Sequence, residues 1–249
     1  MLPESAVICV IAKNENCYIE EWLQYHFKLG FDHIYVYDND DNYPLKVLES
    51  MYPGKVTVIY YPGRCLQLRA YYGFVMNYCF QHTWVAFVDV DEFIVLRKHK
   101  SIKELLREKC SSGALVLNWI LFGSNHHKVY ENKPVLERFT KREKNINIHT
   151  KWIVKLSDLD TMVTPHFGKL FNGKALDTNG VEVTESLHYS GVEDVAAVHH
   201  YFTKSEQEFL HKCIRGRADL PEMRQFVADF KDHDKNEIED TSALDFFRN

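Results

Sequence analysis

The segment WVAFVDVDEFIVL, residues 84–96, places three carboxylates inside an otherwise apolar run. Its first part, residues 84–90, is typical of a strand that is buried on both faces. Carboxylates are costly to desolvate unless a cation or hydrogen-bond donors compensate them. Asp89, Asp91 and Glu92 therefore indicate a functional site at the end of a core strand, and we expect a cationic partner there.

Outward from this segment, the first half of the chain alternates short apolar runs with helical stretches. Strands are expected at residues 6–12, 33–37, 55–61 and 84–90, separated by the length that a βαβ crossover requires. Helices are expected between them, at residues 14–30 and 64–81, and after them at residues 101–110. This alternation predicts an α/β fold with a mostly parallel central sheet.

Capping residues set the expected helix ends. Asn14 or Asn16 is a possible cap of the first helix, and Gly30 is its stop signal. Ser101 is the expected N-cap of the third helix, with Glu104 completing a capping box.

The second half of the chain is less regular. A buried strand is expected at residues 113–122, with shorter strand-like pieces at residues 135–140, 151–156 and 196–202, and a helix at residues 205–216. The acidic tail that follows need not be fully ordered. Because no internal repeat or linker is visible, we expect one domain over residues 1–249, with halves at 1–112 and 113–220 and a tail at 221–249.

Charge and cysteine usage exclude several classes of protein. The formal net charge is −5 and there is no long basic block, which argues against a nucleic-acid partner. The six cysteines form no CxxC pair, which argues against a structural zinc site and favours reduced thiols. Residues 6–12 are too few to cross a bilayer and no basic leader precedes them. A soluble, cytoplasmic protein is expected, although a partner could hold it at a membrane.

Asp89 and Asp91 have the spacing of a metal site. On an extended strand they face the same way, about 6 to 7 Å apart, at the edge where open α/β sheets bind ligands. Two such oxygen donors suit Mg²⁺ or Mn²⁺, whose open positions phosphate oxygens fill. The alternative is structural: the carboxylates cap the next helix or pair with Arg97 and Lys98, which is the commoner role of an isolated DxD tripeptide.

Six motifs, taken in order, resemble the GT-A-fold glycosyltransferases of the family 2-like and family 92-like (DUF23) group. They are VIAKNE, EWLQYHFKLGFDHIYVYDN, DVDEF, WILFGS, HHYFTKSEQEF and KCIRG, and the resemblance spans residues 7–240. It implies a Rossmann-like GT-A fold and a hexosyltransferase that moves a sugar from a nucleotide-sugar to a glycan or other hydroxyl acceptor. The expected donor is a UDP-sugar and the expected cofactor is Mn²⁺ or Mg²⁺, with residues 1–112 on the donor side and residues 113–220 on the acceptor side.

The resemblance also implies a set of residues that bind the donor and its metal. Those expected against the nucleotide-sugar are Ala12, Lys13, Asn14, Glu15, Asp38, Arg64, Gln67, Asp89 and Lys151. Asp91 is the implied metal ligand, with Asp89 on the ribose or sharing the metal and His200 as a late ligand. The family has asparagine before that histidine, whereas this chain has His199, so either imidazole could face the site.

Further family positions concern the leaving diphosphate and the acceptor. Lys212 and Arg215 match basic positions that would stabilise the departing UDP. The loop that begins at Asn118 and Trp119 would face the acceptor, with Ser124 and His126 as hydrogen-bonding groups. The donor and acceptor residues also have structural alternatives. Asn14 and Glu15 could cap a helix, and Arg64 could simply be exposed. Lys212 and Arg215 could support a helix C-terminus, and Trp119 could belong to the core.

The sequence does not identify the catalytic base. Family 2-like members invert, so we expect inversion with a base opposite the leaving group. Glu92 stands beside Asp91 as a catalytic candidate, and the other candidate bases are Glu137, His126, His166 and Asp194. Two alternatives to a glycosyltransferase remain: a metal-dependent nucleotidyl or phosphoryl transferase, although no GxxxxGK[ST] motif is present, and a non-catalytic module that binds nucleotide-sugars or carbohydrates.

Overall fold

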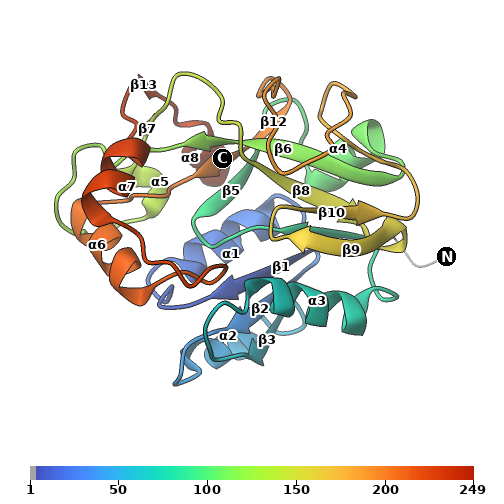
Figure 1. The fold of residues 1–249 in the computed structure, drawn as a ribbon, viewed down its shortest axis with the longest axis horizontal. Helices are drawn as coiled ribbons and strands as arrows, with labels where there is room; N and C mark the ends of the chain where they lie inside the picture. The colour runs from blue at the N-terminus through green and yellow to red at the C-terminus, as the bar shows by residue number, and fades with distance from the viewer. Residues whose placement is uncertain (1–3) are drawn as a thin grey trace.

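A curled sheet of nine strands runs through the computed structural model, which describes residues 4–249 (Figure 1). The strand order is β3-β2-β1-β4-β8-β6-β12-β5, with β11 paired to β6. The strands are β1 Ala6–Ala12, β2 His33–Asp38, β3 Val56–Tyr60, β4 Trp84–Phe87, β5 Glu92–Leu96, β6 Gly113–Leu121, β8 Thr150–Lys155, β11 Lys174–Leu176 and β12 Ala196–His200. Pairing is parallel among β3, β2, β1 and β4 and between β6 and both β11 and β12. The predicted α/β class with a mostly parallel central sheet is confirmed.

Helices, one hairpin and one further pair of short strands complete the fold. The helices are α1 Ile19–Lys28, α2 Leu48–Met51, α3 Gln67–Tyr78, α4 Ile102–Lys109, α5 Val135–Arg138, α6 Glu206–Arg215, α7 Phe226–His233 and α8 Ser242–Arg248, with 3-10 turns η1 Pro44–Val47 and η2 Leu156–Asp158. One hairpin joins β9 Leu159–Thr164 to β10 Phe167–Leu170, and the other pair joins β7 Lys141–Arg142 to β13 Ile238–Glu239.

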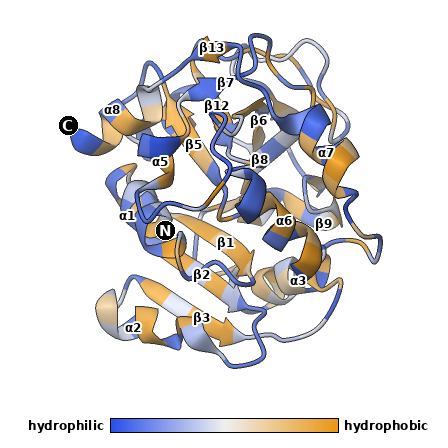
Figure 2. Cartoon of the chain, turned by 90° about the vertical axis from the view of Figure 1, so that its left-hand side faces the viewer, coloured by the Kyte–Doolittle hydropathy of each residue, from blue (hydrophilic) through white to orange (hydrophobic). Residues whose placement is uncertain are grey.

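The sheet is covered on both faces, which explains why its strand β1 is apolar along its whole length (Figure 2). Alternate residues of β1 enter different clusters: Ile8 and Val10 pack with α1 and α4, whereas Val7 and Cys9 pack with α3 and the β9–β10 hairpin. The period of two along a strand therefore supplies two cores from one apolar run.

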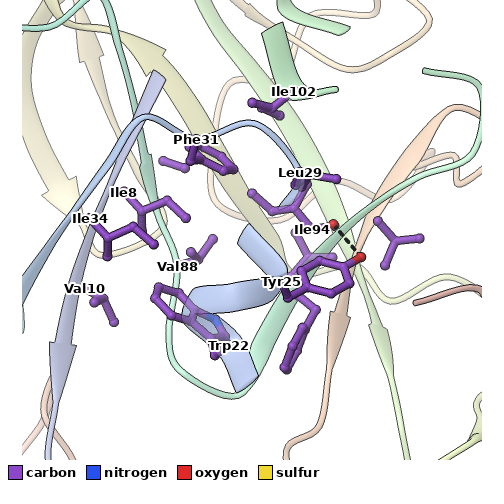
Figure 3. Packing of buried hydrophobic residues seen from close by; sticks show 14 of the residues in the cluster. Ile8, Val10, Trp22, Tyr25, Leu29, Phe31, Ile34, Val88, Ile94 and Ile102 are labelled. Carbon is purple, nitrogen blue, oxygen red and sulfur yellow. Dashed lines mark hydrogen bonds between the residues drawn. The ribbon is translucent and has the colours of Figure 1, made fainter. Parts of the chain in front are cut away.

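Helix α1 fixes the start of β5, next to the acidic residues. Trp22 and Tyr25 lie in the core beside Ile94 (Figure 3). The indole nitrogen of Trp22 donates to the carbonyl of Glu92 at 2.7 Å, and the Tyr25 hydroxyl donates to the carbonyl of Ile94 at 3.1 Å. These bonds hold the backbone at the site through side chains that are themselves packed.

The strand expected at residues 84–90 ends earlier than predicted. It stops at Phe87, and the amide of Glu92 donates to the carbonyl of Asp89 at 3.0 Å, which closes a turn. The physical reason is that β4 pairs with β1 and β8 whereas β5 pairs with β12, so the chain must change direction between them. Asp89 and Asp91 thus lie on a turn and not on one face of an extended strand.

Where a strand was expected at residues 135–140, residues 135–138 form a short helix. Val135 and Leu136 donate their backbone amides to the carboxylate of Glu21 at 2.7 and 3.1 Å. A carboxylate from a distant helix satisfies the first amides of α5 and stabilises a helical start after Pro134.

The expected caps are confirmed in part. Ser101 accepts from the Glu104 amide, as predicted, but the Glu104 carboxylate accepts from Lys100, so the capping box is not completed. Neither Asn14 nor Asn16 caps α1, whose first amides bond to the carbonyl of Glu15.

The acidic tail, which was expected to need no full order, forms defined elements. It contributes α7, β13 and α8 to the fold, and β13 pairs with β7. Its order comes from this pairing and from packing that its composition does not reveal.

Replacing Trp22 with alanine tests the link between α1 and β5. We expect Trp22→Ala to lower the free energy of unfolding by about 3–5 kcal/mol, because it empties a buried site and leaves the Glu92 carbonyl without its donor. Urea denaturation measures the change. Phe80→Ala is the control, because Phe80 is 90% exposed and should change stability by less than about 0.5 kcal/mol; equal losses would refute the role of Trp22.

His26 gives a pH-dependent test of the same core. Its ring lies 2.9 Å from the carbonyl of Trp22, and burial lowers its pKa to about 3. The unfolded residue binds a proton below about pH 6.5, so the free energy of unfolding falls as pH drops from there toward 3. We expect His26→Phe to reduce this slope by up to about 1.4 kcal/mol per pH unit between pH 4 and 6. An unchanged slope in His26→Phe, measured by urea denaturation across this pH range, would contradict the assignment.

Candidate active site

A cavity of about 380 Å³ brings together side chains from β1, α3, β6, β12, α6 and the turn between β4 and β5. Ten of the residues predicted for the site meet here. The predicted residues that line the cavity are Lys13, Glu15, Gln67, Asp89, Asp91, Trp119, His166, His200, Lys212 and Arg215. The loops after β1, β2 and β4 contribute because parallel strands end at the same edge of a sheet.

Asp89 and Glu92 share one buried lysine. The Lys151 ammonium lies 2.9 Å from Asp89 and 3.2 Å from Glu92, and Gln67 donates to the other oxygen of Asp89 at 2.7 Å. Burial would lower the pKa of Lys151, but the two carboxylates raise it above its ordinary value. Burial raises the pKa of Glu92 to about 8 despite Lys151, and the neighbouring Asp89 and Asp91 carboxylates act in the same direction. Lys151 is thus the one cation that Asp89 and Glu92 share.

Asp91 has a separate pair of partners. The Lys212 ammonium lies 2.5 Å from one carboxylate oxygen, and His200 Nε2 lies 3.5 Å from the same oxygen. Burial alone would raise the pKa of Asp91, but Lys212 and His200 hold it well below its ordinary value. Burial lowers the pKa of Lys212 to about 8 and that of His200 to about 4. At neutral pH the Asp91 carboxylate is therefore ionised beside a neutral imidazole.

Cations gather on the side of the cavity that α6 supplies. Arg215 donates to the carbonyl of Lys13 at 2.6 Å and pairs with Glu15. Arg217 and Arg224 line the same cavity from the segment that follows α6. Guanidinium and ammonium groups arranged in this way suit phosphate oxygens.

The two adjacent histidines of β12 face opposite sides, as alternation along a strand requires. His199 packs against Phe122 and lies 3.9 Å from Asp240, away from the cavity. His200 is the imidazole that faces Asp91, which resolves the alternative left open by the sequence.

Several expected donor residues do not line this cavity. Asp38 accepts from the amides of Asp40 and Leu45 at 3.1 and 2.9 Å and supports the loop after β2. Arg64 is exposed and Ala12 is in the core. Asn14 lines a neighbouring cavity.

Lys151, expected to contact the nucleotide-sugar, lies behind Asp89 and is 1% exposed. It is not among the residues that line the cavity. The structure therefore gives it a positioning role toward two carboxylates.

Of the candidate bases, only His166 lines the cavity. Its Nδ1 lies 2.8 Å from the carbonyl of Thr150, which leaves Nε2 as the acceptor, and burial lowers its pKa to about 3. Glu137 pairs with Arg248, and Asp194 pairs with Lys98 at the surface. Glu92 lies beneath the turn, and His126 is exposed on its loop.

Of the residues predicted to face the acceptor, Trp119 lines the cavity. Its ring stacks on His149 with centroids 5.1 Å apart and has His200 edge-on at 4.3 Å. Asn118 donates to two backbone carbonyls, those of Asn147 and His188, so its amide holds loops together. Ser124 accepts from the amide of His126, and neither of the two lines the cavity.

The structure adds lining residues that the sequence did not single out. They include Asn39, His149, Arg217, Arg224, Asp229 and His233. Asn39 directly follows Asp38, so the correct loop was identified but the neighbouring residue faces the cavity. Residues 224–233 were assigned to a tail, and no local motif marks them as part of a site.

Two residues fit a divalent cation. Asp91 and His200 offer one carboxylate oxygen and one imidazole nitrogen 3.5 Å apart, and both residue types bind Mn²⁺. Asp89 is held away by Lys151 and Gln67, and residues 4–249 contain no cluster of three or more acidic, histidine or cysteine side chains arranged to hold a metal. Mg²⁺ and Mn²⁺ commonly take one or two protein ligands and complete their shell with phosphate oxygens. Asp91 and His200 are therefore enough protein ligands, if the Lys212 ammonium shares the Asp91 oxygen with the cation or moves away from it.

Replacing Lys151 tests whether its ammonium compensates the Asp89 and Glu92 carboxylates of the turn. We expect Lys151→Met to lower the free energy of unfolding by about 3–5 kcal/mol, because Asp89 and Glu92 lose their common cation in a buried setting. The exposed Lys100 gives a control, since Lys100→Met should cost less than about 0.5 kcal/mol. Chemical denaturation of both variants decides the matter; a small loss for Lys151→Met would show that other groups neutralise the turn.

A family model described as glycosyltransferase family 92 matches residues 5–240 of the chain. Three similar proteins carry the same family name. The protein from Ricinus communis is 25% identical over 45% of this chain and 21% of its own length, and that from Oryza sativa subsp. japonica is 26% identical over 41% and 18%. The protein from Arabidopsis thaliana is 27% identical over 84% of this chain and 37% of its own length. The chain thus spans well under half the length of these relatives.

Solved structures give weaker similarities. One 4-diphosphocytidyl-2C-methyl-D-erythritol synthase, from Anaerococcus prevotii, has a TM-score of 0.35 and 15% identity over 62% of this chain and 72% of its own. A second has a TM-score of 0.36 and 10% identity over 74% and 94%. Both scores are too low to support a statement about activity.

Within residues 4–249, no helix has the length and apolar character needed to cross a membrane.

Proposed function

The chain belongs to glycosyltransferase family 92, and on that premise we propose that it transfers a sugar from a UDP-sugar to a hydroxyl of a glycan or other acceptor. The observation that carries the proposal is the cavity in which the acidic turn, with Asp89 and Asp91, faces Lys212 and Arg215. Negative and positive groups around one space suit a diphosphate that is bound with a divalent cation.

The nucleotide end of the donor is proposed to lie against the loops after β1 and β2. Lys13 and Asn39 line the cavity there, and Gln67 lines it at the start of α3. Asn39 is held by its amide, which donates to the carbonyls of Tyr61 and Gly63 at 2.7 and 3.1 Å. Gln67 is held by Asp89. Polar groups fixed in this way can discriminate a base or a ribose with little loss of side-chain entropy.

The diphosphate is proposed to lie between α6 and the acidic turn. Lys212 and Arg215 supply charge where the leaving UDP becomes more negative. Asp91 and His200 would hold Mn²⁺ or Mg²⁺, which when bound stabilises the same developing charge. The half-buried ring of Trp119 is proposed to contact the sugar, since it lines the cavity beside His200.

Inversion requires a group that accepts the proton of the attacking hydroxyl. We assign this role to His166, the candidate base that lines the cavity. With its pKa lowered to about 3, His166 is neutral at pH 7 and accepts a hydrogen bond at Nε2. Because so weak a base takes a full proton only late, it orients the hydroxyl more than it deprotonates it in the ground state.

Calorimetric titration of UDP, with Mn²⁺ or with EDTA, tests the donor site. We expect binding with Mn²⁺ and a loss of affinity of at least about tenfold on chelation or in Asp91→Asn, because a metal ligand is removed. Asp194→Asn is the matched control, since Asp194 pairs with Lys98 at the surface. Binding that is insensitive to both EDTA and Asp91→Asn would refute the metal site.

Turnover separates an enzyme from a binding module. With Mn²⁺ and a panel of UDP-sugars, we expect the unmodified protein to release UDP from at least one donor faster than the Asp91→Asn variant does. Tight UDP binding without release from any donor would support a non-catalytic module instead.

A further inference from the structure

A second cavity, of about 510 Å³, adjoins the donor cavity. The two share Glu15, Phe202, Lys212 and Arg215 in their walls. A ligand in the second cavity would therefore lie beside the groups proposed to hold the diphosphate, which is where an attacking acceptor must approach.

Aromatic rings form much of its wall and are held in place. The Tyr18 hydroxyl donates to Glu208 at 2.8 Å, and the Lys204 ammonium lies 4.3 Å from the centre of the Tyr18 ring. Tyr130 has the Arg138 guanidinium 5.3 Å from its ring centre. Arg138 in turn makes two hydrogen bonds to Glu208, at 2.8 and 3.0 Å, so one buried ion pair braces both tyrosines.

Two polar atoms of the lining residues are buried without a hydrogen-bond partner in the described part of the chain. They are Oε2 of Glu15 and Oγ1 of Thr203, in residues that are 4% and 1% exposed. Neither atom is exposed to the cavity, so the polar contacts of a ligand must come from other groups of the wall.

The charges of this cavity are largely paired within the described residues. Lys212 bonds to Asp91, Arg215 pairs with Glu15, and Glu208 pairs with Arg138. The groups left to meet a ligand are the amides of Asn14 and Gln207, the His211 imidazole, the aromatic faces and the Lys204 ammonium, which lies over the Tyr18 ring. Such a wall matches a sugar ring, whose C–H faces stack on aromatic rings while its hydroxyls bond to amides and charged groups.

We propose that this cavity binds a sugar unit of the acceptor, with Tyr18 and Tyr130 as its aromatic wall and Gln207 as a hydrogen-bonding group. The inference rests on the proposed function, because it makes the acceptor a carbohydrate and places it across the Glu15–Arg215 pair from the donor. Tyr130 and Gln207 are already coupled, since the Gln207 side chain accepts from the Tyr130 amide at 2.9 Å.

Saturation-transfer NMR tests the proposal with defined probes. The full chain, saturated with UDP and Mn²⁺, is mixed with the methyl α- and β-glycosides of glucose, galactose, mannose and N-acetylglucosamine. We expect transfer to at least one glycoside and a signal at least threefold weaker in Tyr130→Ala and in Gln207→Ala. Tyr189→Ala is the matched control, because Tyr189 is 73% exposed and outside both cavities, and it should keep the signal.

Parallel UDP calorimetry separates the two ways of failing. If UDP does not bind the unmodified protein, the proposed function falls and the acceptor assignment falls with it. If UDP binds equally to all variants but no glycoside gives a signal, or the signals survive both substitutions, only the acceptor cavity is refuted.

Discussion

The ion pair between Asp91 and Lys212, with Lys151 behind it, is the interaction on which the rest of the site depends. Three carboxylates on one buried turn would destabilise the fold if they were left uncompensated. Lys151, from β8, holds Asp89 and Glu92, and Lys212, from α6, holds Asp91. The turn is therefore stable only when strands and helices that are distant in the sequence have come together around it.

The need to compensate these carboxylates ties the packing of the strands and of α6 to the groups of the site. The turn exists because β4 and β5 pair with different neighbours, and Trp22 fixes its far end by donating to the Glu92 carbonyl. Helix α6 must then lie across the carboxyl edge of β1 to bring Lys212 and Arg215 to the acids. Its capping box, formed by Ser205 and Glu208, sets where this helix begins. The same Glu208 braces the wall of the second cavity, so one helix start serves both cavities.

Local patterns in the sequence predicted the first strands of the sheet and the position of the acidic turn. The apolar runs gave β1, β2 and β3, and the acid triplet marked the turn that carries the site. Long-range contacts account for most of what was missed. Residues 135–138 are helical because Glu21 satisfies their first amides, and Lys151 lies behind Asp89 because β8 is inserted between β4 and β6. Residues 224–233 reach the cavity only through tertiary packing. The choice between His199 and His200 needed only the phase of β12, which a single sequence does not fix.

A crystal structure with UDP and Mn²⁺ tests the central claim most directly. The account predicts the diphosphate between Lys212, Arg215 and the acidic turn, with Mn²⁺ on Asp91 and His200 and the Lys212 ammonium shared with or moved toward phosphate oxygens. UDP bound elsewhere, with the Asp91–Lys212 pair unchanged and no metal on either residue, would contradict it.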